Sequence, residues 1–294
     1  MLNVIQAQSL HENPLPRKSN LINYSLFKTL DTWIDFRSFS IKYVAEGRER
    51  YHVNDNIYDV HAGQYILAND HASGKVEINS KTWVKGICID VAPSLISEAL
   101  AARLRPDTLQ PDASLDKFFT SPDYLDNLYH AADNKVGTLL KSLESELTSD
   151  ENTNHSIRPD VYFDFATAIV EDHIPVYQAL QRIPSVKMQT AKDLFRRVNK
   201  ARLYIENLVH SPVNIDELAA DVFMSPYHFH RTFKSAFRTS PYHYSLMVRL
   251  NYARKLILEK HITLTEAAAA TGFSDLSAFG KSYKKYQGVL QAKG

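Results

Sequence analysis

The strongest constraint on the fold of this chain is a pattern that occurs twice near its C-terminal end. Residues 214–225 (NIDELAADVFMS) are echoed about 49 residues later by residues 263–274 (TLTEAAAATGFS). Each copy opens with a polar residue that is followed three positions later by Glu, which predicts a capping box and a short helix. An internal repeat of this kind indicates one structural unit that is built twice.

A second helix is predicted after a tight turn in each copy. These helices cover residues 225–237 (SPYHFHRTFKSAF) and 274–286 (SDLSAFGKSYKKY). A small residue, Ala219 in the first copy and Ala268 in the second, stands where the two helices must approach closely. A short helix, a tight turn and a second helix are typical of the helix-turn-helix motif, whose second helix enters the major groove of DNA.

One long helix is predicted between the two copies. Ser240 is a suitable N-cap, and Pro241 suits the first helical position. Apolar residues then recur at helical spacing as far as about Glu259. A helix of roughly 18 residues is about 27 Å long, whereas neighbouring major-groove openings lie about 34 Å apart. A single chain could therefore place two recognition helices in successive grooves without dimerising.

From about Lys192 to its end, the chain resembles the DNA-binding domain of AraC/XylS-type transcription regulators. The resemblance covers roughly the last third of the chain. It implies a sequence-specific DNA-binding regulator of the bacterial type, with double-stranded DNA as its partner and RNA polymerase as a further partner of an activator. Four motifs carry the resemblance: residues 225–234 (SPYHFHRTFK), 240–244 (SPYHY), 249–256 (RLNYARKL) and 272–279 (GFSDLSAF).

Three features depart from the family pattern. Arg238 stands where the family usually has Gly, and Tyr283 replaces the usual Phe. After residues 288–289 (GV) the family's Pro and the following Tyr-Arg are missing, since the sequence ends in LQAKG. We therefore expect an altered cap after the first recognition helix and a weaker end to the second module.

Candidate DNA-contacting residues follow from the helical period. On the first recognition helix, Phe229, Phe233 and Phe237 recur every four residues and are expected in the core. Of the opposite face, Arg231 can donate two hydrogen bonds to guanine or clamp a phosphate. A solvated surface is the alternative interpretation of such a face, and the repeat favours groove contact instead. The predicted contact residues of this helix are Tyr227, His230, Arg231 and Lys234.

The second recognition helix has a different outward face. Phe279 and Tyr283 are core residues by their spacing. The outward set carries no Arg, Asn or Gln, so we expect weaker base discrimination and more reliance on phosphates. Arg249 is expected to be structural, and Gly272 to serve the turn. The predicted contact residues are Leu276, Ser277, Lys281, Lys284 and Lys285.

The charge of the chain is divided between its two parts. Residues 185–294 contain 17 Lys and Arg against 8 Asp and Glu, a net charge of +9. Residues 1–184 contain 17 against 25, a net charge of −8, so the whole chain is close to neutral at +1. A basic C-terminal third beside an acidic remainder is expected if only that third binds a polyanion.

The N-terminal part shows the period of a β-protein. Residues 39–44 alternate between apolar and polar, and residues 54–56 (NDN) lie between two short predicted strands. Further strands are predicted at 64–68, 75–79 and 82–90, after an arm of little regular structure over residues 1 to about 25. Short strands at this spacing indicate a small β-barrel or a double-sheet roll. Residues 46–47 (EG) and 61–63 (HAG) around the hairpin resemble the cupin-type sensing domain of the same family.

Helices are predicted after residue 92, at 93–104, 115–132, 136–147 and 160–182, the last interrupted at Pro175. The family resemblance implies that such helices carry homodimer contacts. The predicted fold class is therefore α+β. It comprises a cupin-like barrel domain with an N-terminal arm (residues 1–91), a helical dimerisation or linker region (92–183) and an all-α domain with two helix-turn-helix motifs joined by a long helix (184–294).

The composition of the chain indicates its cellular compartment and the kinds of site that it is expected to lack. The single Cys88 excludes an internal disulfide and fits a reducing compartment. No signal peptide and no apolar stretch of membrane-spanning length are recognised, so we expect a cytoplasmic protein. His52, His61 and His71 are scattered without the spacing of a metal site. We therefore expect no catalytic residues, no metal and no cofactor.

The sequence is interpreted as that of a transcription regulator controlled by a small molecule or a protein at its N-terminal domain. Residues that would bind such an effector are not predicted. Two alternatives remain, namely a metal-dependent cupin enzyme with a helical appendage and an adaptor whose repeat docks other proteins. Stoichiometric metal in the purified protein would favour the first alternative, whereas salt-sensitive DNA binding favours the regulator.

Overall fold

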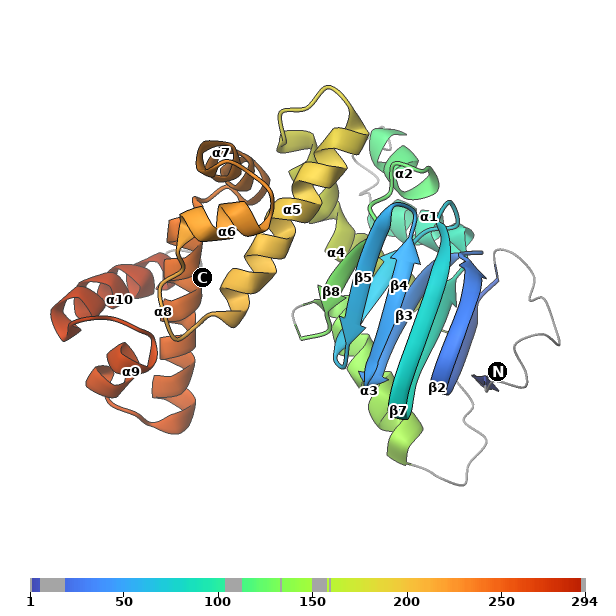
Figure 1. Ribbon diagram of the computed structural model, residues 1–294, viewed down its shortest axis with the longest axis horizontal. Coiled ribbons are helices and arrows are strands. Elements are labelled where there is room, and N and C mark those ends of the chain that lie inside the picture. Colours follow the sequence, from blue (N-terminus) through green and yellow to red (C-terminus); the bar gives the residue numbers. More distant parts are fainter. Residues whose placement is uncertain are drawn as a thin grey trace. The chain divides into compact units, whose positions relative to one another are not determined.

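The computed structural model describes residues 2–5, 19–103, 113–132, 134–149, 158 and 160–291. It divides into two compact units, Met1–Tyr177 and Gln178–Gly294 (Figure 1). The division falls inside helix α4 (Val161–Arg182). The three-part division drawn from the sequence, with boundaries at 91 and 183, remains a prediction.

The first unit is built on a nearly closed, mainly antiparallel sheet (Figure 1). The strand β7 joins its two halves, because it pairs with β3 through its C-terminal part and with β4 through its N-terminal part, and with β2 along both. Residues 39–44 of β3 are buried or half-buried on both faces, so their alternation does not separate a buried face from an exposed one. Val44 lies in the core that fills the barrel, whereas Phe39, Ile41 and Tyr43 are buried on the other face of the strand. The strands are β1 (Leu2–Ile5), β2 (Leu21–Asp35), β3 (Phe39–Glu46), β4 (Arg48–Val53), β5 (Asn56–His61), β6 (Gln64–Ala68), β7 (Ser73–Val91) and β8 (Asn127–His130).

Two predictions about the strands were wrong. Segments 75–79 and 82–90 belong to one strand, β7, in which residues 80–83 stand opposite the single residue Lys28 of β2. Ile78 and Val84 on either side of this irregularity are both buried, so the inward alternation continues through it. The predicted N-terminal arm contains strand β1, and β2 already begins at Leu21; residues 6–18 of the arm lie outside the described residues.

Helices cover one side of the sheet, and one of them differs from its prediction. The helix predicted over 115–132 ends at Thr120, and β8 follows as a strand paired with β6. Tyr129 of β8 stacks on Tyr65 of β6, which shows tertiary packing overriding local helix propensity. Pro175 lies inside a continuous α4 and does not interrupt it. The helices of this unit are α1 (Pro93–Arg103), α2 (Ala113–Thr120), α3 (Lys135–Ser149) and the greater part of α4.

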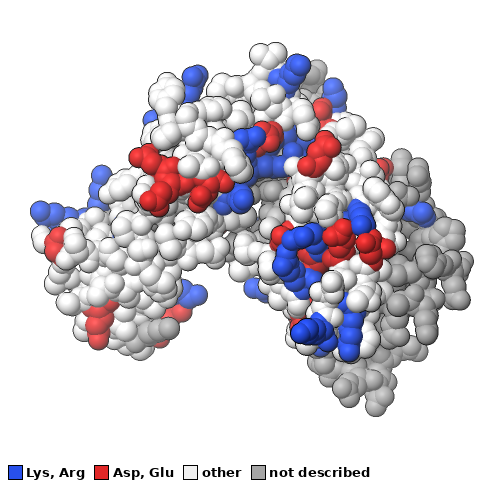
Figure 2. Space-filling model, viewed as in Figure 1, with Lys and Arg blue, Asp and Glu red and all other residues white. Residues whose placement is uncertain are grey.

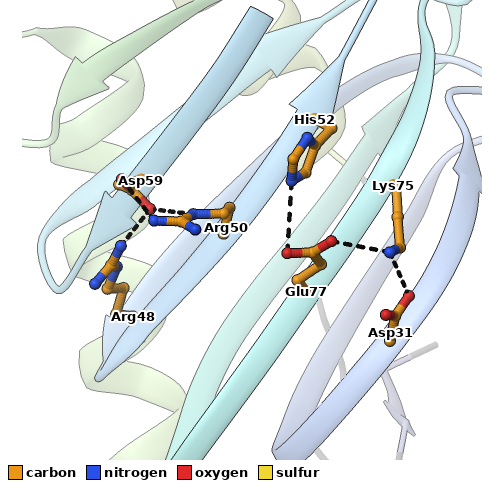
Figure 3. A network of polar contacts seen from close by, with 7 residues as sticks. All are labelled: Asp31, Arg48, Arg50, His52, Asp59, Lys75 and Glu77. Carbon is orange, nitrogen blue, oxygen red and sulfur yellow. Dashed lines mark hydrogen bonds and ion pairs between the residues drawn. The ribbon is translucent and has the colours of Figure 1, made fainter.

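The outer face of the barrel over strands β2, β4, β5 and β7 is charged and open to solvent. Asp59 of β5 accepts hydrogen bonds from Arg48 (2.6 Å) and Arg50 (2.8 Å) of β4 (Figure 3). These two bonds lower the pKa of Asp59 to about 2. Lys75 of β7 lies 2.9 Å from both Glu77 and Asp31. Exposed ion pairs contribute about 0–1 kcal/mol each, so this network keeps the face soluble more than it holds the strands together.

The inner face of the barrel is partly polar. Lys42 of β3, Cys88 of β7 and Asn23 of β2 are direct neighbours across three strands. Asn23 is 5% exposed, and its Oδ1 atom has no hydrogen-bond partner among the described residues. Burial raises the pKa of the Cys88 thiol to about 11. Polar residues that point inward explain why the start of β2 was mistaken for an irregular arm.

The second unit is all-helical, as the sequence predicts. Its two helix pairs, α6–α7 and α9–α10, are joined by α8 (Figure 1). The 20 residues of α8 give a length of about 30 Å. No helix in the described part of the chain is both long and apolar enough to cross a membrane. The helices are α5 (Met188–Asn207), α6 (Ile215–Asp221), α7 (Pro226–Phe237), α8 (Pro241–Lys260), α9 (Leu264–Ala270) and α10 (Leu276–Gln291).

Side-chain caps start all four helices from α6 to α9, each where the sequence predicts a helix to begin. Thr263 and Glu266 form the complete capping box of α9. The hydroxyls of Ser225 and Ser240 accept hydrogen bonds from the backbone amides of His228 and His243. Each serine is followed by Pro at the first helical position. The side chain of Asn214 caps α6 in the same way. Local capping chemistry therefore fixes where the helices of the repeat begin.

Candidate nucleic-acid interface

The first recognition helix, α7, has a buried face and an open one. Phe229 and Phe233 are fully buried and pack against each other with ring centroids 5.6 Å apart. The opposite side chains project outward, and Tyr227 is 78% exposed. Arg238 ends the helix in the left-handed region (φ 60°) and leaves its cation at the surface. All four contact residues predicted on this helix are exposed: Tyr227, His230, Arg231 and Lys234.

The turn before α7 has the same construction as the turn before α10. Phe223 (φ 55°) and Gly272 (φ 68°) hold equivalent left-handed positions. In each turn the next amide donates to the carbonyl of the predicted small residue, from Met224 to Ala219 (2.9 Å) and from Phe273 to Ala268 (3.1 Å). The two copies of the helix-turn-helix repeat therefore share an equivalent backbone hydrogen bond in their turns.

Phe223 is strained and 84% exposed, so its replacement by Gly is expected to stabilise the unit by about 0.5–1 kcal/mol. Gly adopts the left-handed conformation without a Cβ clash, and little apolar contact is lost with the ring. Phe223→Ala removes the same ring but keeps the Cβ, and should show no such gain. Urea unfolding of the two variants measures the difference, and equal stabilities would contradict the role of strain.

The second recognition helix begins one residue later than predicted. The side chain of Asp275, rather than Ser274, caps it by accepting the amide of Ala278 at 2.7 Å. Phe279 thereby occupies the buried place that Phe229 holds in α7. Both Ser and Asp are good N-caps, so the local sequence could not decide between them. The turn of the second copy is one residue longer than that of the first.

The shifted start changes which residues of α7 and α10 correspond. Ser277 takes the place of Tyr227, Gly280 that of His230, Lys281 that of Arg231 and Lys284 that of Lys234. Gly280 is exposed, and a Cβ built on it would meet no described atom within 4 Å. Gly inside a helix lowers its stability by about 0.5–1 kcal/mol relative to Ala. The position of Gly280 within the predicted helix was therefore informative, and the prediction did not use it. The five residues predicted on α10 are all exposed: Leu276, Ser277, Lys281, Lys284 and Lys285.

Charge is unevenly spread over the second unit. Asp and Glu side chains gather over α6, which carries Asp216, Glu217 and Asp221 (Figure 2). The outward face of α10 carries three exposed lysines instead. The net positive charge of this part of the chain is therefore carried by the recognition helices and the helices around them, while α6 is locally acidic.

The family model described as a helix-turn-helix domain matches residues 218–291. The match begins in α6 and runs to the end of α10, so it contains both recognition helices. The second unit carries an AraC-type helix-turn-helix domain.

Relatives of the AraC-type domain are transcriptional regulators. The probable transcriptional regulator LumQ of Photobacterium leiognathi is 31% identical over 86 residues, which are 29% of this chain and 35% of LumQ. The regulator GbdR of Pseudomonas aeruginosa is 33% identical over 29% of this chain and 23% of its own length. The Msm operon regulatory protein of Streptococcus mutans is 20% identical over 87% of this chain and 83% of its own. The match thus spans about a third of LumQ and a quarter of GbdR.

Two solved structures are similar to parts of the chain. A regulator with an AraC-type DNA-binding domain from Chromobacterium violaceum is 28% identical, with a TM-score of 0.30, over 31% of this chain and 82% of that one. ToxT from Vibrio cholerae is 10% identical, with a TM-score of 0.35, over 91% of this chain and 94% of its own.

The histidines considered for a metal site are apart from one another. His52 lies 3.5 Å from Glu77, and the Nε2 atom of His71 lies 3.1 Å from the carbonyl oxygen of Thr120. Among the described residues, no group of three or more His, Cys, Asp or Glu is placed to hold a metal ion.

Proposed function

We propose that this chain is a sequence-specific DNA-binding transcription regulator that acts through its AraC-type domain. The observation that carries the proposal is the pair of exposed recognition faces on α7 and α10, joined by the 20-residue helix α8. The length of α8, about 30 Å, is close to the 34 Å between neighbouring major-groove openings. One chain can therefore contact two half-sites on one face of a duplex.

The two recognition helices contribute differently to DNA binding. Arg231 of α7 reads a guanine through its O6 and N7 atoms, while His230 and Tyr227 contact neighbouring base edges or methyl groups. On α10 the small Ser277 and the exposed lysines favour contacts to phosphates, which position the protein without reading sequence. Leu276, which is 47% exposed, is placed to contact a thymine methyl group.

Arg231→Ala is expected to weaken binding to the selected operator by about 1–3 kcal/mol while leaving the fold intact. The operator is first selected from a random duplex pool with the full-length chain, and affinities are then measured for it and for a scrambled duplex. Lys234→Ala on the same face serves as the matched control. It should weaken both duplexes equally and reduce the salt dependence of binding. Unchanged discrimination in the Arg231→Ala variant would contradict base reading by this residue.

The first unit senses the signal, which is a small molecule or a protein. Support comes from two buried polar groups of this unit. Glu49 accepts a hydrogen bond from Tyr51 at 2.5 Å, and desolvation raises its pKa to about 6. The Oδ1 atom of Asn23 has no hydrogen-bond partner among the described residues. Such groups destabilise an interior that apolar residues would fill at lower cost. Thermal unfolding of the full chain in the presence of polar metabolites tests this assignment, because a ligand of the folded state raises the midpoint.

Further partners belong to the same proposal. The helices after residue 92 would carry homodimer contacts, and an activator would also contact RNA polymerase. Binding of the signal would shift a population between arrangements that are competent and incompetent for DNA binding. The chain would carry out this role in the cytoplasm without a catalytic step.

A further inference from the structure

The loop between α5 and α6 packs on the turn between α9 and α10. A Cβ on Gly272 of this turn would lie 2.5 Å from the carbonyl oxygen of His210 and 2.8 Å from the Cα of Ser211. The Nδ1 atom of His210 lies 3.0 Å from the carbonyl oxygen of Ala270, at the end of α9. A segment that leads into the first helix-turn-helix therefore touches the second one directly, 60 residues further along the chain.

The same turn is also contacted by α8. Arg249 is 6% exposed and donates through Nη1 to the carbonyl oxygens of Thr271 (3.0 Å) and Gly272 (3.4 Å). Its guanidinium also lies 4.8 Å from the ring centroid of Phe273. Tyr252 of α8 meets the ring of His210 edge-on at 5.4 Å. We call this meeting point of the loop, α8 and the α9–α10 turn the turn junction.

From this geometry we propose that the turn junction fixes the orientation of the second recognition helix relative to the first. A connecting helix alone leaves each module free to pivot about its ends. The contact of the His210 side chain with the carbonyl oxygen of Ala270, beside the backbone packing of residues 210–211 on Gly272, adds a second link that does not pass along α8. The two modules are thereby braced against rotation. The proposal rests on the proposed function, because it concerns how two half-sites are read together.

A braced pair of modules makes the separation of the half-sites part of the recognised sequence. One base pair more or less moves a half-site by about 3.4 Å and rotates it by about a tenth of a turn. The turn junction cannot absorb such a change, because its atoms are already at hydrogen-bond and van der Waals distances. His210, Gly272 and Arg249 are therefore positioning residues that determine specificity without touching DNA.

The experiment compares duplexes that carry the selected half-sites at their native separation and at separations changed by one or two base pairs. The full-length wild type is expected to bind the shifted duplexes about tenfold more weakly or worse, a loss of about 1.4 kcal/mol. In His210→Ala and Gly272→Ala, binding to the native duplex weakens and the preference for native separation falls below about threefold. Gly288→Ala, on an exposed Gly of α10 without a described neighbour within 4 Å, is the matched control and keeps the wild-type preference.

The outcomes separate this inference from the proposed function. If the wild type binds no duplex selectively, the proposed function fails. If the wild type discriminates between separations and His210→Ala keeps the full preference, the proposed role of the turn junction is contradicted. Circular dichroism of each variant establishes that its helices are intact. Should Gly272→Ala unfold because of its steric clash, His210→Ala alone decides, since it removes a contact and introduces none.

Discussion

Between pH 7 and pH 4, the wild-type first unit is expected to lose about 3 kcal/mol more stability than a His173→Gln variant. His173 lies in α4 with 0% exposure. Its Nδ1 atom is 2.8 Å from the carbonyl oxygen of Ile169, and its Nε2 atom is 3.0 Å from the hydroxyl of Tyr129. A carbonyl only accepts, so Nδ1 carries the proton and Nε2 accepts from Tyr129. The imidazole is therefore neutral and fully hydrogen-bonded in the folded state.

Burial lowers the pKa of His173 from 6.5 to about 4. Between pH 6.5 and about pH 4, His173 is protonated in the unfolded chain and neutral in the folded chain. The free energy of unfolding therefore falls as the pH is lowered through this range. Glu49 acts in the opposite direction, since its pKa is raised to about 6 and its folded form is favoured by acid. The comparison with the variant removes that contribution, because both proteins contain Glu49.

Urea unfolding of the wild type and the variant at several pH values measures the effect, and amide hydrogen exchange in the barrel strands reports whether the first unit opens. His71→Gln, at an exposed histidine of the same unit, is the matched control for the loss of one histidine side chain. Parallel stability curves for the wild type and His173→Gln between pH 7 and pH 4 would contradict the buried neutral imidazole.

Arg249→Leu is expected to destabilise the second helix-turn-helix by about 2–4 kcal/mol. The change removes charge-assisted hydrogen bonds to the carbonyls of Thr271 and Gly272 and the contact of the guanidinium with the ring of Phe273. Leu has a similar volume but leaves the buried carbonyl of Thr271 and the partly buried carbonyl of Gly272 without this donor. The loss should appear as faster hydrogen exchange in α9 and α10 than in α7.

The control is Arg254→Leu, because Arg254 is an exposed arginine on the same helix. Its effect should stay within about 0.5 kcal/mol. If both substitutions changed hydrogen exchange in α9 and α10 to the same small extent, Arg249 would have no special structural role. A uniform acceleration across the whole second unit would instead indicate that the unit opens as a single body.

The repeat could be predicted because its signals are local. Asn214, Ser225, Ser240 and Thr263 each act within three residues of their position, and all four cap the helix that was expected to follow. The barrel was harder to predict. Asn23 points its polar side chain inward and hides the period of β2, and β8 is a strand only because β6 offers it a partner.

The candidate interface was predictable to the extent that helical spacing separates an apolar face from a polar one. All nine predicted contact residues project outward, and their contacts with DNA remain a prediction. The correspondence of Gly280 with His230 could not be predicted, because it depends on which of two adjacent cap residues is used. The turn junction brings His210 and Ala270 together across a distance in sequence that no local pattern reports.

The lone thiol of the chain has a practical consequence. Cys88 lies between two strands with a pKa of about 11, so very little of it is ionised at neutral pH and it reacts slowly with alkylating reagents. Cysteines introduced at Lys234 and Lys284 could therefore be labelled selectively in an otherwise natural chain. A pair of fluorophores at these two sites would measure whether the distance between α7 and α10 stays constant when a signal is added.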